Sequence, residues 1–352
     1  MPAGIVDLRS DTVTKPSEAM RKAMYDAEVG DDVYREDPTV NRLQERAAEI
    51  FNREAGLYVV SGTMGNQTAI KVLTHHGHEV ICEDRSHIYN YEMGMVSAFS
   101  GLVPRTIHAE DGILTWDLIA PHVRVRNDHR ARTGLIEIEN TSNLAGGSVY
   151  PPANTDDIVD HAHAVGLPVH LDGARIFNAS TALGKSVVEL TKKFDSVTFC
   201  LSKGLGAPVG SMLVGSREFI EEARIVRKML GGGMRQAGVL AAAGLIALEE
   251  GPKRLHIDHA NAKFLARELA QIPGFKVDAA KVVSNILFFD VTGTGLTAYE
   301  ISKLLAAQGV LANATNAQLI RMVTHLDVDR AGCERALKTL REVVVPQKAA
   351  AS

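Results

Sequence analysis

The sequence predicts an α/β protein, with a large domain on a mostly parallel sheet and a smaller C-terminal α+β domain. Short apolar runs alternate with helical segments between about residues 54 and 215. The runs are continuous and often β-branched, as in strands that are buried on both faces. The chain has 352 residues, more than the roughly 100–200 that one domain usually holds.

The strands expected in the large domain are short and lie between helical patterns. Helices are expected at 63–76, 156–165 and 181–193. This alternation is typical of βαβ units, whose ligand sites form at the carboxyl ends of the strands. The expected strands are 57–60, 79–82, 103–107, 135–139, 169–171, 196–200 and 212–214.

The pattern changes after residue 215, and we expect three parts. Residues 1–50 form an N-terminal arm with a helix at 40–51, residues 51–250 the large domain and residues 251–352 the small one. Pro252 is expected to separate two helices. The later elements expected are helices at 216–230, 235–249, 253–271, 298–308 and 330–343, and strands at 286–291 and 319–323.

Composition excludes several classes of protein. Hydrophobic residues make up 45% and charged residues 23%, which is typical of a globular chain. Lys and Arg number 38 against 42 Asp and Glu, so the surface lacks the basic charge that a nucleic-acid or anionic-membrane partner requires. The sequence shows three distant cysteines, no signal peptide and no apolar span. A cytoplasmic protein is expected.

A lysine and an aspartate follow two of the expected strands. Lys203 lies in SKGLGAPVGS, directly after the strand at 196–200. It precedes the glycines, unlike the lysine of a nucleotide P-loop. Asp172 ends the strand in PVHLDGARIF, where Arg175 follows. A surface lysine, a helix N-cap and an Asp–Arg pair are the alternative interpretations.

Two further segments suit a planar, phosphorylated ligand. In YVVSGTMGNQTA a strand leads through Gly62 and Thr63 into a helix, and the N–H groups of a helix N-terminus favour phosphate. Ordinary capping is the alternative. His87 follows the strand at 79–82, where it can stack on a ring, act as a base or serve structure alone. His75, His76 and His78 match no usual zinc spacing, so no metal is expected.

Together these residue types suit pyridoxal 5'-phosphate. A lysine binds this cofactor covalently, a carboxylate keeps its pyridine nitrogen protonated, and a helix N-terminus takes its phosphate.

The motifs also resemble a known family, the low-specificity L-threonine aldolases. The resemblance covers nearly the whole chain and implies fold type I of the pyridoxal-phosphate enzymes. It implies cleavage of β-hydroxy-α-amino acids, L-threonine and L-allo-threonine among them, to glycine and an aldehyde. It also implies a homotetramer with shared active sites. The motifs are LRSDTVTKP, EVGDDVYREDPTVNRLQ, SGTMGNQTA, IEIENT, HLDGARIFNA, LSKGLGAPVGS, GGGMRQAG and IRMVTH.

The resemblance implies a role for each matching residue. Cofactor contacts are implied for Lys203 (covalent), Asp172 (ring nitrogen), Arg175 (ring hydroxyl), His87 (stacking), Gly62 and Thr63 (phosphate), and Arg235 (phosphate, from a neighbouring subunit). Substrate contacts are implied for Ser10 and Arg321 (carboxylate) and for Tyr34 (site lining). His87 or an ordered water is the candidate base, with assistance from His129, the candidate second active-site histidine.

Two positions depart from the family pattern. Arg35 replaces a common glycine, and Ser142 stands where many members have histidine. Another reaction on the same fold, β-elimination or transamination, is the first alternative, because fold alone does not decide the reaction. A non-catalytic binding protein and a metal-dependent aldolase or hydrolase are the others.

Overall fold

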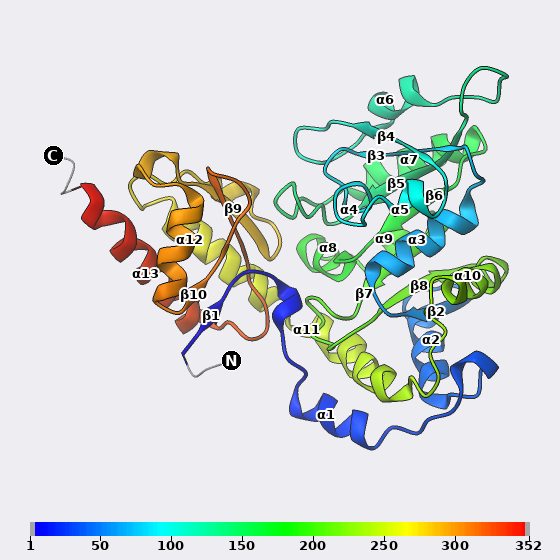
Figure 1. Ribbon diagram of the computed structural model, residues 1–352, viewed down its shortest axis with the longest axis horizontal. Coiled ribbons are helices and arrows are strands. Elements are labelled where there is room, and N and C mark those ends of the chain that lie inside the picture. Colours follow the sequence, from blue (N-terminus) through cyan, green and yellow to red (C-terminus); the bar gives the residue numbers. More distant parts are fainter. Residues whose placement is uncertain (1–3, 349–352) are drawn as a thin grey trace. The chain divides into compact units, whose positions relative to one another are not determined.

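The computed structural model describes residues 4–348, which form two compact units (Figure 1). The smaller unit combines residues 4–15 with residues 253–348, and the larger unit is residues 16–252. The outermost residues of the domains expected from the sequence, 1–3 and 349–352, lie outside the described residues.

The larger unit is built on a seven-stranded sheet in the order β2-β8-β7-β6-β5-β3-β4. β8 is antiparallel to both of its neighbours, and every other pair is parallel. Each strand predicted for this sheet is present, with bounds that agree to within two residues. The strands are β2 (Ala55–Val59), β3 (Glu79–Glu83), β4 (Val103–Ile107), β5 (Thr133–Glu139), β6 (Val169–Asp172), β7 (Ser196–Cys200) and β8 (Ser211–Gly215).

Helices cover both faces of this sheet. Successive side chains of a strand point to opposite faces, so each buried strand packs against helices on two sides. In β7 the side chain of Thr198 lies against Gly65 of α3. The ring of Phe199, on the other face, stacks on Phe51 of α2 and meets Phe177 of α8 edge-on. The helices are α1 (Glu18–Tyr25), α2 (Pro38–Phe51), α3 (Gly62–Leu73), α4 (His87–Asn90), α5 (Met95–Ala98), α6 (Trp116–Ile119), α7 (Pro152–Ala164), α8 (Ile176–Leu183), α9 (Val187–Thr191) and α10 (Arg217–Met229).

Two helix predictions are wrong at a glycine and at a proline. The helix expected at 181–193 is divided at Gly184, whose φ of 63° ends α8, and Ser186 then caps α9. The helices expected on either side of Pro252 form one helix, α11 (Gly238–Leu269). The residue before a proline avoids the helical region partly because its Cβ clashes with the proline ring. That residue here is Gly251, which has no Cβ.

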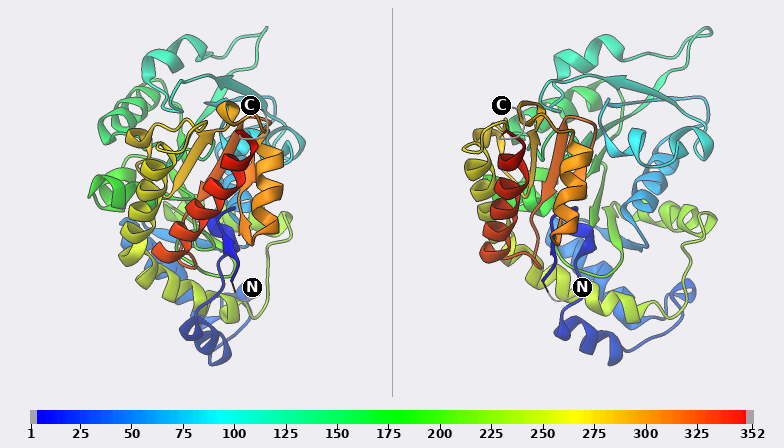
Figure 2. Two further views of the ribbon diagram at one scale, coloured as in Figure 1. Left: turned by 90° about the vertical axis from the view of Figure 1, so that its left-hand side faces the viewer. Right: turned by 60° about the vertical axis from the view of Figure 1, so that its left-hand side comes forward.

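The smaller unit has a three-stranded antiparallel sheet in the order β11-β12-β9 and a parallel pair, β1 with β10. Helices α12 and α13 pack side by side in this unit (Figure 2). Among the described residues, no helix is long and apolar enough to span a bilayer. The elements are β1 (Val6–Asp7), β9 (Ile286–Asp290), α12 (Ala298–Ala307), β10 (Val310–Leu311), β11 (Asn313–Ala314), β12 (Leu319–Val323) and α13 (Arg330–Lys348).

Candidate active site

Four of the predicted cofactor residues of the larger unit lie at one edge of its sheet. β2 runs in the same direction as β3 to β7, because β8 is antiparallel to both β2 and β7. The carboxyl ends of these strands therefore meet at the edge where α/β sheets bind ligands. Thr63 follows β2, His87 follows β3, Asp172 ends β6 and Lys203 follows β7.

Asp172 is buried, with 1% of its surface exposed. Its Oδ2 accepts a hydrogen bond from Nδ2 of Asn66 (2.7 Å), and its Oδ1 accepts one from the N–H of Ala174 (3.0 Å). The alternative interpretation of Asp172 as a helix N-cap is wrong, because Arg175 occupies the N-cap position of α8. Arg175 is itself buried.

The N-terminus of α3 lies against the end of β7. A Cβ on Gly62 would come within 2.9 Å of Sγ of Cys200, so this approach requires glycine. Ser61 caps the helix by accepting from the N–H of Met64 (3.2 Å). The first N–H groups of an α-helix have no acceptor within the helix. Those of Gly62 and Thr63 are therefore suited to an anion.

Lys203 lies in the loop 201–210 that joins β7 to the antiparallel β8. The loop is closed by a hydrogen bond from the N–H of Leu201 to the carbonyl of Gly210 (3.1 Å). Gly210 has φ of 104°, and a Cβ there would overlap the ring of Tyr58. Lys203 is half-buried, and its positive charge acts on the imidazole of His87.

His87 begins α4 and is held by two buried carboxylates. Its N–H donates to Oε2 of Glu139 (2.6 Å), and its Nδ1 lies 2.8 Å from Oε1 of Glu92. Burial has the largest influence on the pKa of His87 and lowers it. The hydrogen bond to Glu92 and the charge of Asp172 outweigh burial and the opposing Lys203, so the pKa of His87 is raised.

Sequence reasoning assigned no role to Asn66, Glu92 or Glu139, although all three fall in segments that it singled out. Burial and the charge of Asp172 raise the pKa of Glu139 to about 7, although two backbone N–H groups oppose that rise. Glu139 ends β5 as Asp172 ends β6, so a strand-end carboxylate was a usable signal. Asn66 and Glu92 lie inside helical or loop segments and not at strand ends, so the sequence offers no such signal for them.

The segment 31–35 explains one departure from the family pattern. Arg35 has φ of 64°, a conformation that glycine adopts at no steric cost. Its guanidinium pairs with the carboxylate of Glu221 on α10. Arg235 pairs with Asp31 across 3.2 Å. Tyr34 is 73% exposed.

Three predicted residues are not joined to this group by the contacts of the larger unit. His129 is exposed, and its N–H donates to Oδ1 of Asn127 (2.8 Å). Ser10 and Arg321 belong to the smaller unit, where Ser10 caps a 3-10 turn and Arg321 lies on β12. The other departure, Ser142, is buried, and its N–H donates to the carbonyl of Ser148 (3.0 Å).

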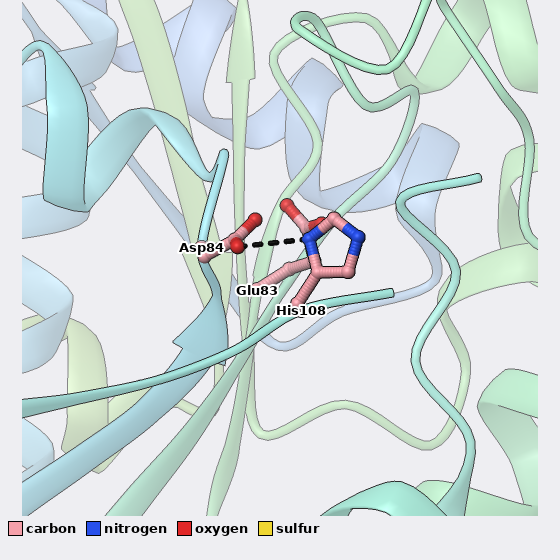
Figure 3. Close-up of side chains that lie close together, drawn as sticks. All are labelled: Glu83, Asp84 and His108. Carbon is pink, nitrogen blue, oxygen red and sulfur yellow. Dashed lines mark hydrogen bonds and ion pairs between the residues drawn. The ribbon is translucent and has the colours of Figure 1, made fainter. Parts of the chain in front are cut away.

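A cluster of potential metal ligands lies at the end of β3, where Glu83 and Asp84 lie beside His108 (Figure 3). Nδ1 of His108 lies 2.9 Å from Oδ2 of Asp84. Arg85 donates to Oε1 of Glu83 (2.8 Å) and lies 3.7 Å from Asp84. The guanidinium therefore balances the two carboxylates. Within residues 4–348, no group of three or more potential metal ligands contains His75, His76 or His78.

Comparison with known proteins gives the class. Residues 7–292 match the family described as beta-eliminating lyase. Low-specificity L-threonine aldolase 1 of Arabidopsis thaliana is 46% identical over 349 residues, which cover 97% of this chain and 96% of the relative. The low specificity L-threonine aldolase of Escherichia coli K12 is 43% identical over 327 residues, which cover 93% and 95%. The chain belongs to the beta-eliminating lyase family, and these two relatives within it are low-specificity L-threonine aldolases. The predicted family resemblance is confirmed.

Solved structures confirm the predicted fold class. The threonine aldolase of Leishmania major superposes with a TM-score of 0.79 at 20% identity, covering 96% of this chain and 99% of that one. The serine palmitoyltransferase of Sphingomonas wittichii gives 0.75 at 16% identity, covering 96% and 87%. At these identities the likeness concerns the fold, which is fold type I of the pyridoxal-phosphate enzymes.

Proposed function

We propose that this protein is a pyridoxal-phosphate-dependent carbon–carbon lyase. It cleaves L-threonine, L-allo-threonine and other β-hydroxy-α-amino acids to glycine and an aldehyde. The names of its full-length relatives support this reaction. The observation that carries the proposal is the convergence of Lys203, Asp172, His87 and the N-terminus of α3 at one edge of the sheet.

The residues present fit the cofactor. Asp172 is buried and accepts two hydrogen bonds, which hold its carboxylate in place for a protonated ring nitrogen. The missing Cβ of Gly62 brings the N–H groups of α3 close to β7, where they can take a phosphate. When bound, the cofactor accepts the electrons released as a bond to the substrate Cα breaks.

The chain's own residues then have separate tasks. Lys203 binds the cofactor covalently through Nζ, and Asp172 holds the proton at the ring nitrogen. Arg175 contacts the ring hydroxyl, and Gly62 and Thr63 bind the phosphate. His87 stacks on the ring.

The proposal also assigns residues to the substrate. Ser10 and Arg321 hold its carboxylate, so that the Cα–Cβ bond is the one oriented for cleavage. Tyr34 lines the site. His87 accepts the β-hydroxyl proton with help from His129, because a histidine titrates near neutral pH.

We further propose a cytoplasmic homotetramer with shared active sites, in which Arg235 of each chain reaches the phosphate of a neighbouring subunit. No metal takes part in the proposed reaction. Arg235 is more than half exposed although it pairs with Asp31, which is compatible with a contact to a neighbour.

The test is acetaldehyde release from L-threonine by the cofactor-loaded protein, followed with a coupled alcohol dehydrogenase and with Lys203→Ala alongside. Acetaldehyde from the wild type alone supports the aldolase and the role of the lysine. A yellow protein that forms a keto acid without acetaldehyde would move the assignment to β-elimination or transamination. A colourless, inactive wild type would refute the cofactor assignment.

A further inference from the structure

Behind His87 lies a buried carboxylate, Glu92, with none of its surface exposed. Its Oε1 faces Nδ1 of His87 (2.8 Å) and accepts from Nδ2 of Asn66 (2.9 Å). Its Oε2 accepts from Nε2 of Gln67 (2.6 Å). Three nitrogen atoms, one each from His87, Asn66 and Gln67, therefore surround this carboxylate.

This arrangement determines which ring nitrogen of His87 carries the proton. A charged carboxylate can only accept hydrogen bonds, so Nδ1 of His87 must be the donor to Glu92. In the neutral imidazole, Nε2 is then the nitrogen with a free electron pair. Nε2 is therefore the atom that can accept a proton.

Asn66 connects this carboxylate to the cofactor side of the site. Its Nδ2 donates both to Glu92 and to Oδ2 of Asp172 (2.7 Å), and its Oδ1 lies 3.1 Å from Nε2 of His170. Burial lowers the pKa of His170 to about 4, so that ring is neutral. With Nε2–H donating to Asn66, its Nδ1 accepts from the hydroxyl of Ser196 (2.8 Å). The amide orientation of Asn66 is thus fixed on both sides.

We propose that Glu92 is a positioning residue that holds His87 with its proton on Nδ1, so that Nε2 accepts the β-hydroxyl proton of the substrate, and that Asn66 couples Glu92 to Asp172. The statement that this proton comes from the β-hydroxyl group of the substrate rests on the proposed function. The tautomer of His87 rests on the structure alone.

Other groups also face His87. The charges of Asp172 and Lys203 act on its ring with opposite signs. Glu139 accepts from its backbone N–H, and the ring of Tyr91 stacks on it at 5.4 Å between centroids. Removing the charge of Glu92 leaves these groups in place, so its own effect can be measured.

The experiment compares wild type with Glu92→Gln in the full-length protein, with and without pyridoxal phosphate, by nitrogen NMR of labelled histidine. The chain has 13 histidines, so the His87 signals are identified by their loss in His87→Phe. We expect Nδ1–H in the wild type and a titration midpoint above the ordinary value of about 6.5. In Glu92→Gln the midpoint should fall by about one pH unit or more and the tautomer preference should weaken.

Glu137→Gln is the matched control. Glu137 is fully buried, and within the described residues its carboxyl oxygens have no hydrogen-bond partner. Burial and neighbouring carboxylates raise its pKa well above the usual range, so its replacement is expected to change the local charge less than Glu92→Gln does. Glu137→Gln should leave the titration midpoint of His87 unchanged. Glu92→Asp keeps the charge, so its His87 midpoint should lie close to that of the wild type.

Activity supplies the second readout. For Glu92→Gln we expect kcat to fall by about 10²-fold with KM little changed, and the pH–rate profile to follow the His87 midpoint. A wild-type ring with its proton on Nε2, or a midpoint that Glu92→Gln does not move, would overturn the positioning role even if the variants fold poorly. A wild type that shows the expected tautomer but releases no acetaldehyde would overturn the proposed function and leave the positioning intact.

Discussion

The buried ion pair between Asp32 and Arg227 offers a sharp test of how the segment 31–35 is held. The two side chains are 1% and 2% exposed, and Nη2 of Arg227 lies 2.7 Å from Oδ2 of Asp32. The same guanidinium donates through Nη1 to the carbonyl of Tyr58 (2.8 Å). Asp32→Asn keeps the shape but leaves a buried positive charge without its partner. Breaking a buried pair in this way costs about 3–5 kcal/mol of folding free energy.

The ion pair between Arg35 and Glu221 is the matched control, because it joins the same segment, 31–35, to the same helix, α10. Arg35 and Glu221 are 54% and 47% exposed, and exposed pairs contribute about 0–1 kcal/mol. Urea unfolding should therefore show a small loss for Glu221→Gln. For Asp32→Asn the folded-to-unfolded ratio should fall by about a hundredfold or more, at 1.4 kcal/mol for each tenfold change.

Equal losses in the two variants would refute this reasoning. A further variant separates charge from packing. Arg224 is a second partner of the same carboxylate, with Nη1 3.7 Å from Oδ1 of Asp32. Asp32→Leu combined with Arg224→Met and Arg227→Met replaces all three charged groups by apolar ones, and such a replacement often leaves stability unchanged or raised. If the triple variant is as unstable as Asp32→Asn, the loss comes from packing and not from unpaired charge.

Three further predictions concern the site itself. His87→Phe keeps a ring and removes the proton acceptor, so kcat for L-threonine should fall about 10²–10⁴-fold while the cofactor absorbance stays; near-normal turnover would exclude His87 as the base. Gly62→Ala should lower the free energy of unfolding, measured in urea, by about 1–3 kcal/mol, because the new Cβ would lie 2.9 Å from Sγ of Cys200. If adding Cys200→Ala to this variant does not recover most of the loss, the contact is not its cause. The pKa of Glu139 is raised to about 7, so the folded state binds the proton of this carboxyl group more tightly than the unfolded chain does. The resulting contribution to stability is present below about pH 4.3 and is lost as pH rises through about 7. Glu139→Gln should reduce that loss, on the order of 3 kcal/mol, in unfolding measured at about pH 5 and about pH 8; an unchanged loss would contradict it.

The strands of the larger unit were predictable because most of them contain a short apolar and often β-branched run, and these runs alternate with helical patterns. Asp172 and Lys203 follow two such runs, and the topology rule for parallel sheets then places their strand ends at one edge. The buried run of β8, 212–214, does not itself indicate an antiparallel direction, because it resembles those of its neighbours.

The network behind the site was not predictable, because it depends on tertiary contacts between distant segments. Asn66 meets Asp172 across 106 residues of chain, and a buried amide has no pattern of its own in a sequence. The continuity of α11 through Pro252 was missed for a different reason. Part of the tendency of proline to end a helix comes from a clash with the Cβ of the preceding residue, and Gly251 has no Cβ.

The direction of β8 has a consequence for changes in chain length. Ser211 pairs with Val59 on one side and with Cys200 on the other, and these are the last residues of β2 and β7. The Ser61 segment and the Lys203 loop are therefore spaced by two rows of strand hydrogen bonds, about 10 Å in all. An insertion in the loop 201–210 would displace the lysine alone, whereas an insertion in β8 would shift its pairing with both strands. Engineered insertions and natural length variation are thus tolerated less within Ser211–Gly215 than within the loop 201–210.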